Sequence, residues 1–298
     1  MKFYSPLRYP GGKTRLSYFL EKTIEKNFSE KEKVALVEPY AGGAGASLKL
    51  LFSGKVDKII INDLDKAIFS FWKIAVSDAD FLINEVKKVN IDISEWRKQR
   101  EIYNNPLTTT RKLAFATLFL NRTNHSGIIG GGPIGGMAQS GNWNLKARFK
   151  KDTIIEKLEK IKEFRDKIKV RNLDGIMLLK QLEENKKKNN YFIFLDPPYY
   201  QKGKSLYLNH YINKDHKKLL KLLKKSSLKW VMTYDDVSYI RNLYDGFRIS
   251  KFTINHSAFK AKQGKEIVIF SNNVAKVAIN RLLKSLVTIQ SPTFSVND

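Results

Sequence analysis

The apolar residues of the chain gather in short runs that end on acidic or polar residues. VALVEP (34–39) and VDKIIIND (56–63) have the length of buried strands, and segments with helical spacing follow each of them, at 41–52 and 65–76. Strands that alternate with helices predict a parallel sheet with right-handed crossovers. A later run, YFIFLDPPYY (191–200), ends on an aspartate that is followed by two prolines and two tyrosines.

The middle of the chain has a different pattern. Spacing is helical from about 78 to 121, and the segment 122–145 is so rich in glycine that we predict a loop or a loose hairpin there. The alternation of helices and strands then resumes. It closes with two apolar segments, 247–254 and 266–272, that we predict to be antiparallel strands.

These patterns predict one α/β sheet domain that a mostly helical insert interrupts. We place the sheet domain at 1–71 and 152–273, with helices on both faces of the sheet, and the insert at 72–151. The tail 274–298 has an amphipathic start and a polar end, and the sequence assigns it no structure.

Charge is the strongest feature of the composition. The 298 residues contain 54 Lys and Arg against 29 Asp and Glu, which gives a net charge of +25 and an isoelectric point near 9.9. Such an excess favours a polyanionic partner through counterion release. Lysine on ordinary solvated helix faces would give the same number, so charge alone leaves nucleic-acid binding open.

Other features of the composition point to the cell interior. The chain has no cysteine, which fits a reducing compartment. It has no run of 18 apolar residues and no signal-peptide pattern. We therefore predict a soluble cytoplasmic protein that does not bind membranes. The four histidines are scattered along the chain, and we predict no metal site.

The segment EPYAGGAG (38–45) predicts a cofactor site. Glycines directly after a strand let the backbone approach a ligand, and Asp63 ends the next strand about 20 residues later, where a carboxylate can accept hydrogen bonds from ribose hydroxyls. A tight turn followed by a helix-capping aspartate would leave the same pattern. The dinucleotide signature is absent because residue 48 is Leu, and GGKT (11–14) is no phosphate loop because residue 7 is Leu.

The DPPY segment (196–199) has the chemistry to hold an amine. An ionised aspartate only accepts hydrogen bonds, and a proline fixes its own backbone and leaves its carbonyl free. Asp196 and a proline carbonyl would both accept hydrogen bonds from one NH₂ group, and the neighbouring aromatic ring offers a stacking face. Such a site suits the exocyclic amine of a nucleobase, while an ordinary turn after a strand would explain the prolines alone.

Together these motifs resemble those of the Dam-type adenine-N6 DNA methyltransferases, the D12 class, in the motif order of its alpha group. The resemblance rests on RYPGGKTRL (8–16), LVEPYAGGAG (36–45), FLNRTNHSG (119–127), DPPY and KEIVIFSN (265–272). It implies a Rossmann-like methyltransferase sheet with a target-recognition insert. It also implies that S-adenosylmethionine is the cofactor, that its methyl group passes to N6 of a flipped adenine, and that S-adenosylhomocysteine is a product.

The resemblance also implies a set of site residues. Asp63 would hold the ribose, Asp174 would meet the cofactor adenine, and Tyr199 would stack on the target base. The implied catalytic residues are Asp196, Pro197, Pro198 and Tyr199. The implied cofactor-binding residues are Tyr9, Gly11, Gly12, Lys13, Glu38, Pro39, Tyr40, Gly42, Gly43, Gly45, Asp63, Asp174 and Asp196.

The insert is the part expected to contact double-stranded DNA. It is rich in Lys and Arg, which would position it on phosphates, and Arg122, Asn124 and Asn144 are candidates for base edges, with Arg148 a further DNA contact. A cognate restriction endonuclease is a candidate partner. An RNA or ribosomal-RNA adenine-N6 methyltransferase, a protein-glutamine methyltransferase and a non-catalytic DNA-binding protein remain alternatives.

Overall fold

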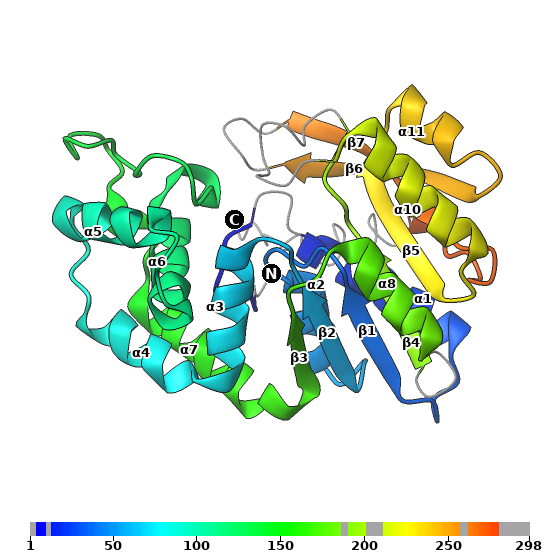
Figure 1. The fold of residues 1–298 in the computed structure, drawn as a ribbon, viewed down its shortest axis with the longest axis horizontal. Coiled ribbons are helices and arrows are strands. Elements are labelled where there is room, and N and C mark those ends of the chain that lie inside the picture. Colours follow the sequence, from blue (N-terminus) through cyan, green and yellow to red (C-terminus); the bar gives the residue numbers. More distant parts are fainter. Residues whose placement is uncertain (1–3, 10–12, 186–189, 201–210, 257–261, 280–298) are drawn as a thin grey trace, which may run out of the picture.

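A seven-stranded sheet forms the centre of the molecule (Figure 1). The computed structural model describes residues 4–9, 13–185, 190–200, 211–256 and 262–279, and in them the strand order is β3-β2-β1-β4-β5-β7-β6. The strands are β1 (Val34–Glu38), β2 (Lys58–Asn62), β3 (Ile168–Arg171), β4 (Asn190–Leu195), β5 (Lys229–Asp235), β6 (Arg248–His256) and β7 (Lys262–Phe270).

The pairing of the strands confirms the predicted α/β fold. Strands β3, β2, β1, β4 and β5 run parallel to one another, and β7 is antiparallel to both β5 and β6. The order begins like that of a doubly wound nucleotide-binding sheet, with β7 inserted between β5 and β6. We call the edge where the five parallel strands end the carboxyl edge, because ligands of such sheets bind there.

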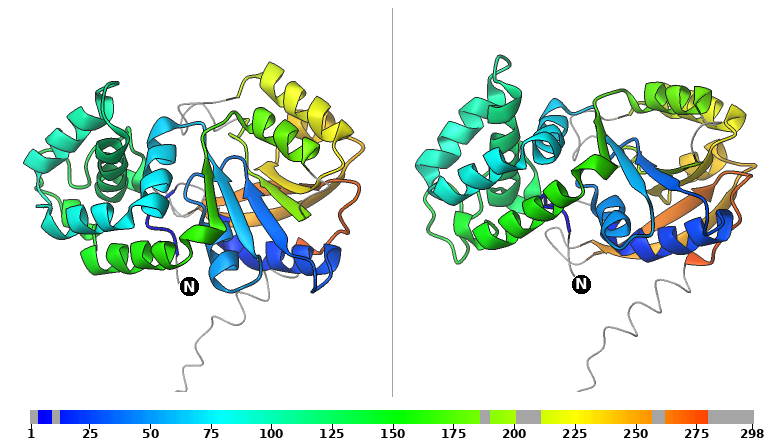
Figure 2. Two further views of the ribbon diagram at one scale, coloured as in Figure 1. Left: turned by 60° about the horizontal axis from the view of Figure 1, so that its bottom comes forward. Right: turned by 90° about the horizontal axis from the view of Figure 1, so that it is seen from below.

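Helices cover both faces of this sheet (Figure 2). Successive side chains of a strand point to opposite faces, so Leu36 of β1 packs in one apolar core and Val37 packs in the other. The helices around the sheet are α1 (Ser17–Asn27), α2 (Gly45–Phe52), α3 (Lys66–Ser77), α8 (Gly175–Glu184), α10 (Asn213–Lys225) and α11 (Ser238–Leu243), with the short 3-10 helices η1 (Lys13–Leu16) and η4 (Arg165–Lys167).

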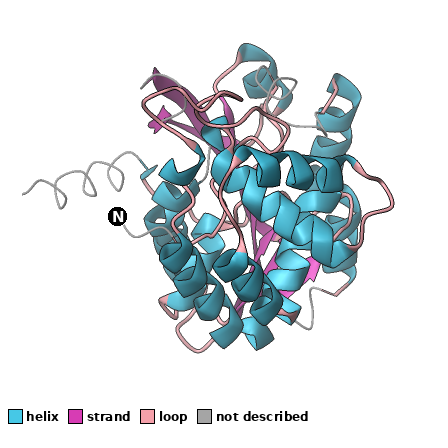
Figure 3. Ribbon diagram, turned by 90° about the vertical axis from the view of Figure 1, so that its left-hand side faces the viewer, coloured by secondary structure: helices cyan, strands magenta, loops and turns pink. Residues whose placement is uncertain are grey.

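The predicted insert forms a helical body beside the sheet. This helical body faces the viewer in Figure 3. Its core is continuous with one core of the sheet, since Phe71 and Trp72 of α3 belong to the same buried cluster as Phe115 and Leu118 of α6. The predicted boundary at residue 72 lies inside α3, and the division into domains stays a prediction. The helical body consists of α4 (Ala79–Lys88), α5 (Ile93–Asn104), α6 (Thr110–Thr123) and α7 (Lys151–Glu163). Helix α7 packs on α4, although all of it except its first residue lies beyond the predicted end of the insert at residue 151.

Two aspartates at the carboxyl edge start helices. The Asp65 side chain accepts hydrogen bonds from the backbone N–H groups of Ala67 and Ile68 at the start of α3, and Asp174 accepts from the first turn of α8. These contacts satisfy donors that a helix leaves unpaired at its N-terminus. They also fix where the chain turns after β2 and β3.

The glycine-rich segment is a loop, as predicted, with only the short 3-10 helices η2 (His125–Gly127) and η3 (Leu145–Ala147). Asn121 ties it to the N-terminal segment: its amide donates to the carbonyl oxygens of Arg8 and Gly127, at 2.7 Å each, and accepts from the Arg8 N–H. Gly127 has a φ of +76°, and a Cβ there would overlap the Arg8 carbonyl oxygen. The close approach of the two segments therefore requires glycine.

The start of the C-terminal tail packs on the sheet domain. Val274 and Ile279 are buried in the core that includes α1. The Asn27 side chain also accepts a hydrogen bond from the Ala275 N–H at 2.6 Å. The sequence left the tail unassigned from residue 274, and the structure packs its first residues on the core around α1. Residues 280–298 lie outside the described residues.

We expect Gly127→Ala to lower the free energy of unfolding by roughly 2 kcal/mol, because it combines a left-handed backbone with a clash against backbone atoms. Gly130→Ala is the matched control in the same loop, since its Cβ would have no neighbour within 4 Å and its φ is not positive. Denaturant unfolding of both variants measures the difference. Equal stability of the two would contradict the proposed close approach.

Candidate active site

Four carboxylates gather along the carboxyl edge because four adjacent parallel strands end there. Glu38 is the last residue of β1, while Asp63, Asp174 and Asp196 follow β2, β3 and β4. The order β3-β2-β1-β4 places the four strand ends side by side. The structure therefore brings together the acidic residues that the sequence predicted for one site.

The glycines after β1 are packed against the N-terminal segment. A Cβ at Gly42 would lie 2.6 Å from the ring of Tyr9, and one at Gly43 would lie 2.9 Å from the Tyr9 Cβ. At Gly45 a Cβ would overlap the Thr14 hydroxyl. Real Cβ atoms do not approach so closely, so the glycines are needed where Tyr9 and Thr14 pack on the loop. The predicted Gly11 and Gly12 lie outside the described residues.

Buried carboxylates hold this glycine loop in place. Asp63 accepts hydrogen bonds from the N–H groups of Gly42, at 2.9 Å, and Asp65, at 3.0 Å. Glu38 accepts from the Ser47 N–H, at 3.1 Å, and from its hydroxyl. Burial raises the pKa of Asp63 and that of Glu38 to about 7 each, against these hydrogen bonds. A positively charged or hydrogen-bonding ligand placed beside these two acids would therefore lower their pKa values and favour their charged forms.

Tyr40 lies between the glycine loop and the start of α8. A Cβ at Gly175 would approach its ring to 2.6 Å, and the Tyr40 hydroxyl is hydrogen-bonded to that of Tyr211 at 2.7 Å. Asp174, one residue before Gly175, is therefore next to the Tyr40 ring along the edge. The Pro39 carbonyl oxygen accepts from the Asn62 amide at 2.8 Å, which fixes the turn after β1.

A buried cluster of charged residues surrounds Asp196, and Lys13 is at its centre. The Lys13 Nζ atom lies 3.5 Å from an Asp196 oxygen and 3.2 Å from a Glu266 oxygen, and it also contacts the Tyr199 hydroxyl. The Tyr199 hydroxyl donates to Glu266 at 2.7 Å. The side chains of Lys13 and Glu266 are only 5% and 1% exposed, whereas that of Asp196 is 20% exposed.

The charges in this cluster set the protonation of Asp196. Burial raises the pKa of its carboxyl to about 6, Lys13 opposes the rise, and the negative charge of Glu266 adds to it. Burial acts to lower the pKa of Lys13, but the combined attraction of Asp196 and Glu266 leaves it raised, so the ammonium group stays charged. A hydrogen bond from Thr233 of β5, at 2.6 Å, further holds the Asp196 carboxylate.

The two tyrosines after the prolines have different surroundings. Tyr199 is 7% exposed and its hydroxyl is directed at Glu266, so in this conformation its ring is not the open stacking face that the sequence predicted. Tyr200 stacks on Tyr239 with 4.4 Å between ring centroids, and its N–H donates to Asp235 at 3.0 Å. Pro197 is buried and Pro198 half-buried at the end of β4.

Sequence reasoning missed Glu266 and Thr233 as members of this site. The signal for Glu266 was a lone carboxylate in an otherwise apolar strand, EIVIF. A buried carboxylate is costly unless it is paired, so such a residue indicates a buried partner. Nothing in the local pattern identified that partner as Lys13, which lies 253 residues earlier in the chain.

The predicted DNA contacts separate into buried and exposed residues. The Asn124 amide donates to three loop carbonyl groups and accepts from the Trp96 indole, and Arg122 is 8% exposed, so neither side chain is presented to a base edge in this structure. Asn124 thereby holds the loop, while Arg122 donates to the Pro6 carbonyl of the N-terminal segment, and their contact with DNA stays a prediction. Asn144 and Arg148 lie on its exposed part.

Comparison with known proteins gives the family. Residues 9–256 match the model of the D12 class N6 adenine-specific DNA methyltransferases, which is more than half of the chain. The chain belongs to this family. The predicted family and activity are therefore confirmed: this is a D12 class methyltransferase that acts on adenine in DNA.

Individual relatives are distant. The Type II methyltransferase M.MjaIII of Methanocaldococcus jannaschii is 23% identical over 287 residues, which cover 87% of this chain and 95% of the relative. Among solved structures, the rRNA methyltransferase aviRa of Streptomyces viridochromogenes superposes with a TM-score of 0.43 at 12% identity, over 89% of this chain and 87% of that one. The assignment rests on the family match.

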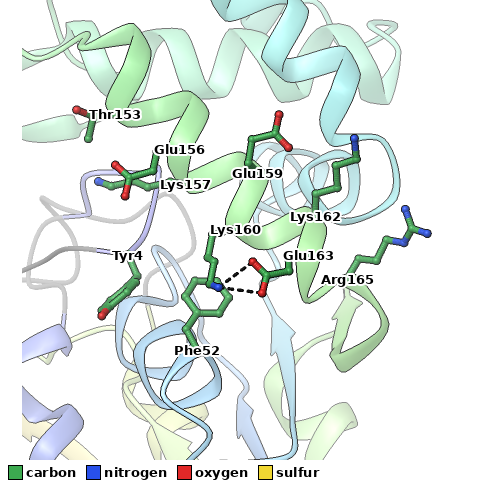
Figure 4. A pocket seen from close by; sticks show the side chains of 10 residues that line it. All are labelled: Tyr4, Phe52, Thr153, Glu156, Lys157, Glu159, Lys160, Lys162, Glu163 and Arg165. Atoms are coloured by element: carbon green, nitrogen blue, oxygen red, sulfur yellow. Dashed lines mark hydrogen bonds and ion pairs between the residues drawn. The ribbon is translucent and has the colours of Figure 1, made fainter.

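Other features of the D12 methyltransferase lie apart from this site. A cavity of about 840 Å³ lies beside α7 and is lined by Tyr4, Phe52, Lys157 and other side chains (Figure 4). Phe52 ends α2, a helix that leads away from the carboxyl edge, so the cavity is distinct from the Asp196 cluster. Within the described residues, no cluster of three or more metal-ligating side chains occurs and no helix is long and apolar enough to cross a membrane.

We expect Lys13→Met to destabilise the D12 methyltransferase more at pH 8 than at pH 5. The variant leaves the buried carboxyl groups of Asp196 and Glu266 without their cation, so the pKa of Asp196 should rise further. A carboxyl group whose pKa is raised in the folded state lowers the stability as the pH rises through that pKa. The expected loss at pH 8 is roughly 3 kcal/mol. Urea unfolding at the two pH values is the measurement.

The double variant Lys13→Met/Glu266→Gln is the control for this prediction. It also removes the negative charge of Glu266, which Lys13 no longer neutralises, and should recover part of the stability at pH 8. A loss of the same size at both pH values, with no recovery in the double variant, would show that the cluster is not charge-coupled.

Proposed function

We propose that this D12 methyltransferase transfers the methyl group of S-adenosylmethionine to N6 of an adenine that is flipped out of a specific sequence in double-stranded DNA. The observation that supports it best is Asp196, a partly exposed carboxylate held by Lys13 and Thr233 beside the glycine loop. Family membership gives adenine in DNA as the target. The cofactor, the flipping and the residue roles are the proposal.

The residues around the carboxyl edge fit such a cofactor. Bound S-adenosylmethionine would supply an electrophilic methyl group on a positively charged sulfur atom. Asp63 and Glu38, with pKa values near 7, are acceptors suited to ribose hydroxyls and to an ammonium group. Asp174 and the Tyr40 ring border the same edge on the β3 side. A cation and hydrogen-bond donors in this place would offset the cost of burying the acids.

Asp196 and the prolines would activate the target amine. The ionised Asp196 carboxylate and the rigid Pro197 carbonyl would accept hydrogen bonds from the two N6 hydrogens, which would localise the nitrogen lone pair. Lys13 holds the carboxylate in its charged form. As the new carbon–nitrogen bond forms, the bond between the methyl carbon and sulfur would break, which leaves S-adenosylhomocysteine. The amine would lose one proton, and Asp196 is placed to accept it. Fixed geometry supplies much of the rate.

The rest of the proposal concerns DNA. N6 of adenine is inaccessible to an enclosed active site while the base is stacked in a duplex, so the base must leave the helix. We infer that the exposed Asn144 and Arg148 contact the DNA, and that the protein works in the cytoplasm. The relative M.MjaIII carries the name of a Type II methyltransferase, which supports pairing with a restriction endonuclease of the same specificity.

Transfer of labelled methyl from S-adenosylmethionine to duplex DNA, with identification of the labelled nucleoside, tests this proposal. We expect label in N6-methyladenine, and a loss of at least 100-fold in rate for Asp196→Asn, which keeps the shape but gives up the charge of the acceptor. RNA of the same sequence is the parallel substrate. Label in RNA alone would favour the RNA methyltransferase reading.

A cofactor-binding titration completes this experiment. Binding of S-adenosylmethionine by both wild type and Asp196→Asn, with transfer by the wild type only, separates the catalytic role of Asp196 from cofactor binding. Cofactor binding without transfer to any DNA tested would favour the non-catalytic DNA-binding alternative. Absence of cofactor binding would contradict the proposed site.

A further inference from the structure

Four positively charged side chains converge where the N-terminal segment passes between the sheet and the helical body. They are Arg8, Arg122 at the end of α6, Arg148 after η3 and Lys157 of α7. Hydrogen bonds hold two of them on the N-terminal segment, since Lys157 Nζ donates to the Ser5 carbonyl at 3.1 Å and Arg122 donates to the Pro6 carbonyl at 3.5 Å. Arg8 belongs to the same segment, and the charges of Arg8 and Arg148 act on Arg122. We call these four residues the cation cluster.

The members of the cation cluster repel one another. Burial, and then the charges of Arg8 and Arg148, lower the pKa of Arg122 to about 10. Burial, and then the charge of Arg122, lower the pKa of Lys157 to about 8, and the neighbouring carboxylate of Glu156 opposes this only in part. Figure 4 shows Lys157 and Glu156 extending from α7 toward the same side.

No acid neutralises the cation cluster within the part of the chain that the structure describes. None of its four members has a carboxylate oxygen within the 4.0 Å of an ion pair there. Among the described residues, the buried Nε atom of Arg122 has no hydrogen-bond partner. By contrast, Arg111 in the same helical body pairs with Asp78. An unpaired buried donor and unpaired cations cost folding free energy, which an anion with several oxygen atoms would offset.

We propose that the cation cluster binds one phosphate group of the DNA backbone. Guanidinium groups match the geometry of phosphate oxygens, and four cations from four segments surround a single anion better than they would line an extended surface. This inference rests on the proposed function for its source of phosphate. Free inorganic phosphate has the same charged oxygen atoms as a DNA phosphate. Separate measurements with inorganic phosphate and with duplex DNA distinguish these two sources.

The position of the cation cluster indicates what a bound DNA phosphate would do. Arg8 directly precedes Tyr9, whose ring packs on Gly42 of the cofactor loop, and Arg122 directly follows Asn121, which holds Arg8 and the glycine-rich loop together. A phosphate bound here would therefore fix one DNA strand relative to both the glycine loop and the helical body (Figure 1). Arg122, predicted as a base contact, would position the backbone instead.

The first test uses inorganic phosphate without DNA. We expect Lys157→Met to melt at a higher temperature than the wild type in chloride buffer, because it removes repulsion, and to gain less stability when phosphate replaces chloride at constant ionic strength. Lys221→Met on α10 is the matched control: the same exchange on an exposed helix that covers the sheet domain. Arg148→Ala, at an exposed position, repeats the test without altering α7.

The second test measures the affinity for duplex DNA as a function of salt. Loss of one phosphate contact should reduce the slope of log K against log salt concentration by about 0.9 in Lys157→Met and in Arg148→Ala, and leave it unchanged in Lys221→Met. Equal phosphate stabilisation in all variants, with unchanged slopes, would overturn the proposal. Phosphate stabilisation that depends on the cluster, with unchanged slopes, would overturn DNA as its source.

The tests of the phosphate site and of methyl transfer can fail independently of each other. If the wild type binds DNA with the expected slope difference but transfers no methyl group, the phosphate site stands and the catalytic proposal fails. If methyl transfer occurs and the variants behave like Lys221→Met, the catalytic proposal stands and the phosphate site is refuted.

Discussion

The buried ammonium group of Lys13 is the interaction on which the site depends. It joins three parts of the chain that are far apart in sequence: the N-terminal segment, the residues after β4 and the last strand, β7. Two carboxylates and a tyrosine hydroxyl share this one cation, and each would be costly to bury without it. The same segment that carries Lys13 places Tyr9 and Thr14 on the glycine loop. The proposed sites for the methyl donor and the methyl acceptor would thus be connected by one short stretch of chain.

Local patterns predicted the parts of this molecule that local physics determines. The apolar runs at β1, β2 and β4 and the acids that follow them were sufficient to predict a parallel sheet with Glu38, Asp63 and Asp196 at one edge, because strand period and crossover handedness leave few alternatives. The many glycines between residues 122 and 145 likewise predicted the loop after α6. The motifs then identified the family, which the match over residues 9–256 confirms.

Other features could not be predicted because they arise from contacts between distant segments. The partnership of Lys13 with Glu266 spans 253 residues, and no spacing rule links the two. Asn124 was a reasonable base contact by residue type, yet its amide is used by Trp96 and three loop carbonyl groups. Tyr199 was expected to present its ring, and its hydroxyl instead completes the charged cluster. In each case a polar side chain pairs with a buried group of a distant segment, and its contact with a ligand stays a prediction.

The pH dependence of single-turnover methyl transfer tests most directly whether the Lys13 cluster controls Asp196. With the carboxylate as acceptor, the rate should fall as the pH drops through the Asp196 pKa of about 6. In Glu266→Gln the midpoint should move to lower pH, because the negative charge of Glu266 raises that pKa. A rate that stays constant down to pH 5, or a midpoint that Glu266→Gln leaves in place, would contradict this account of the active site.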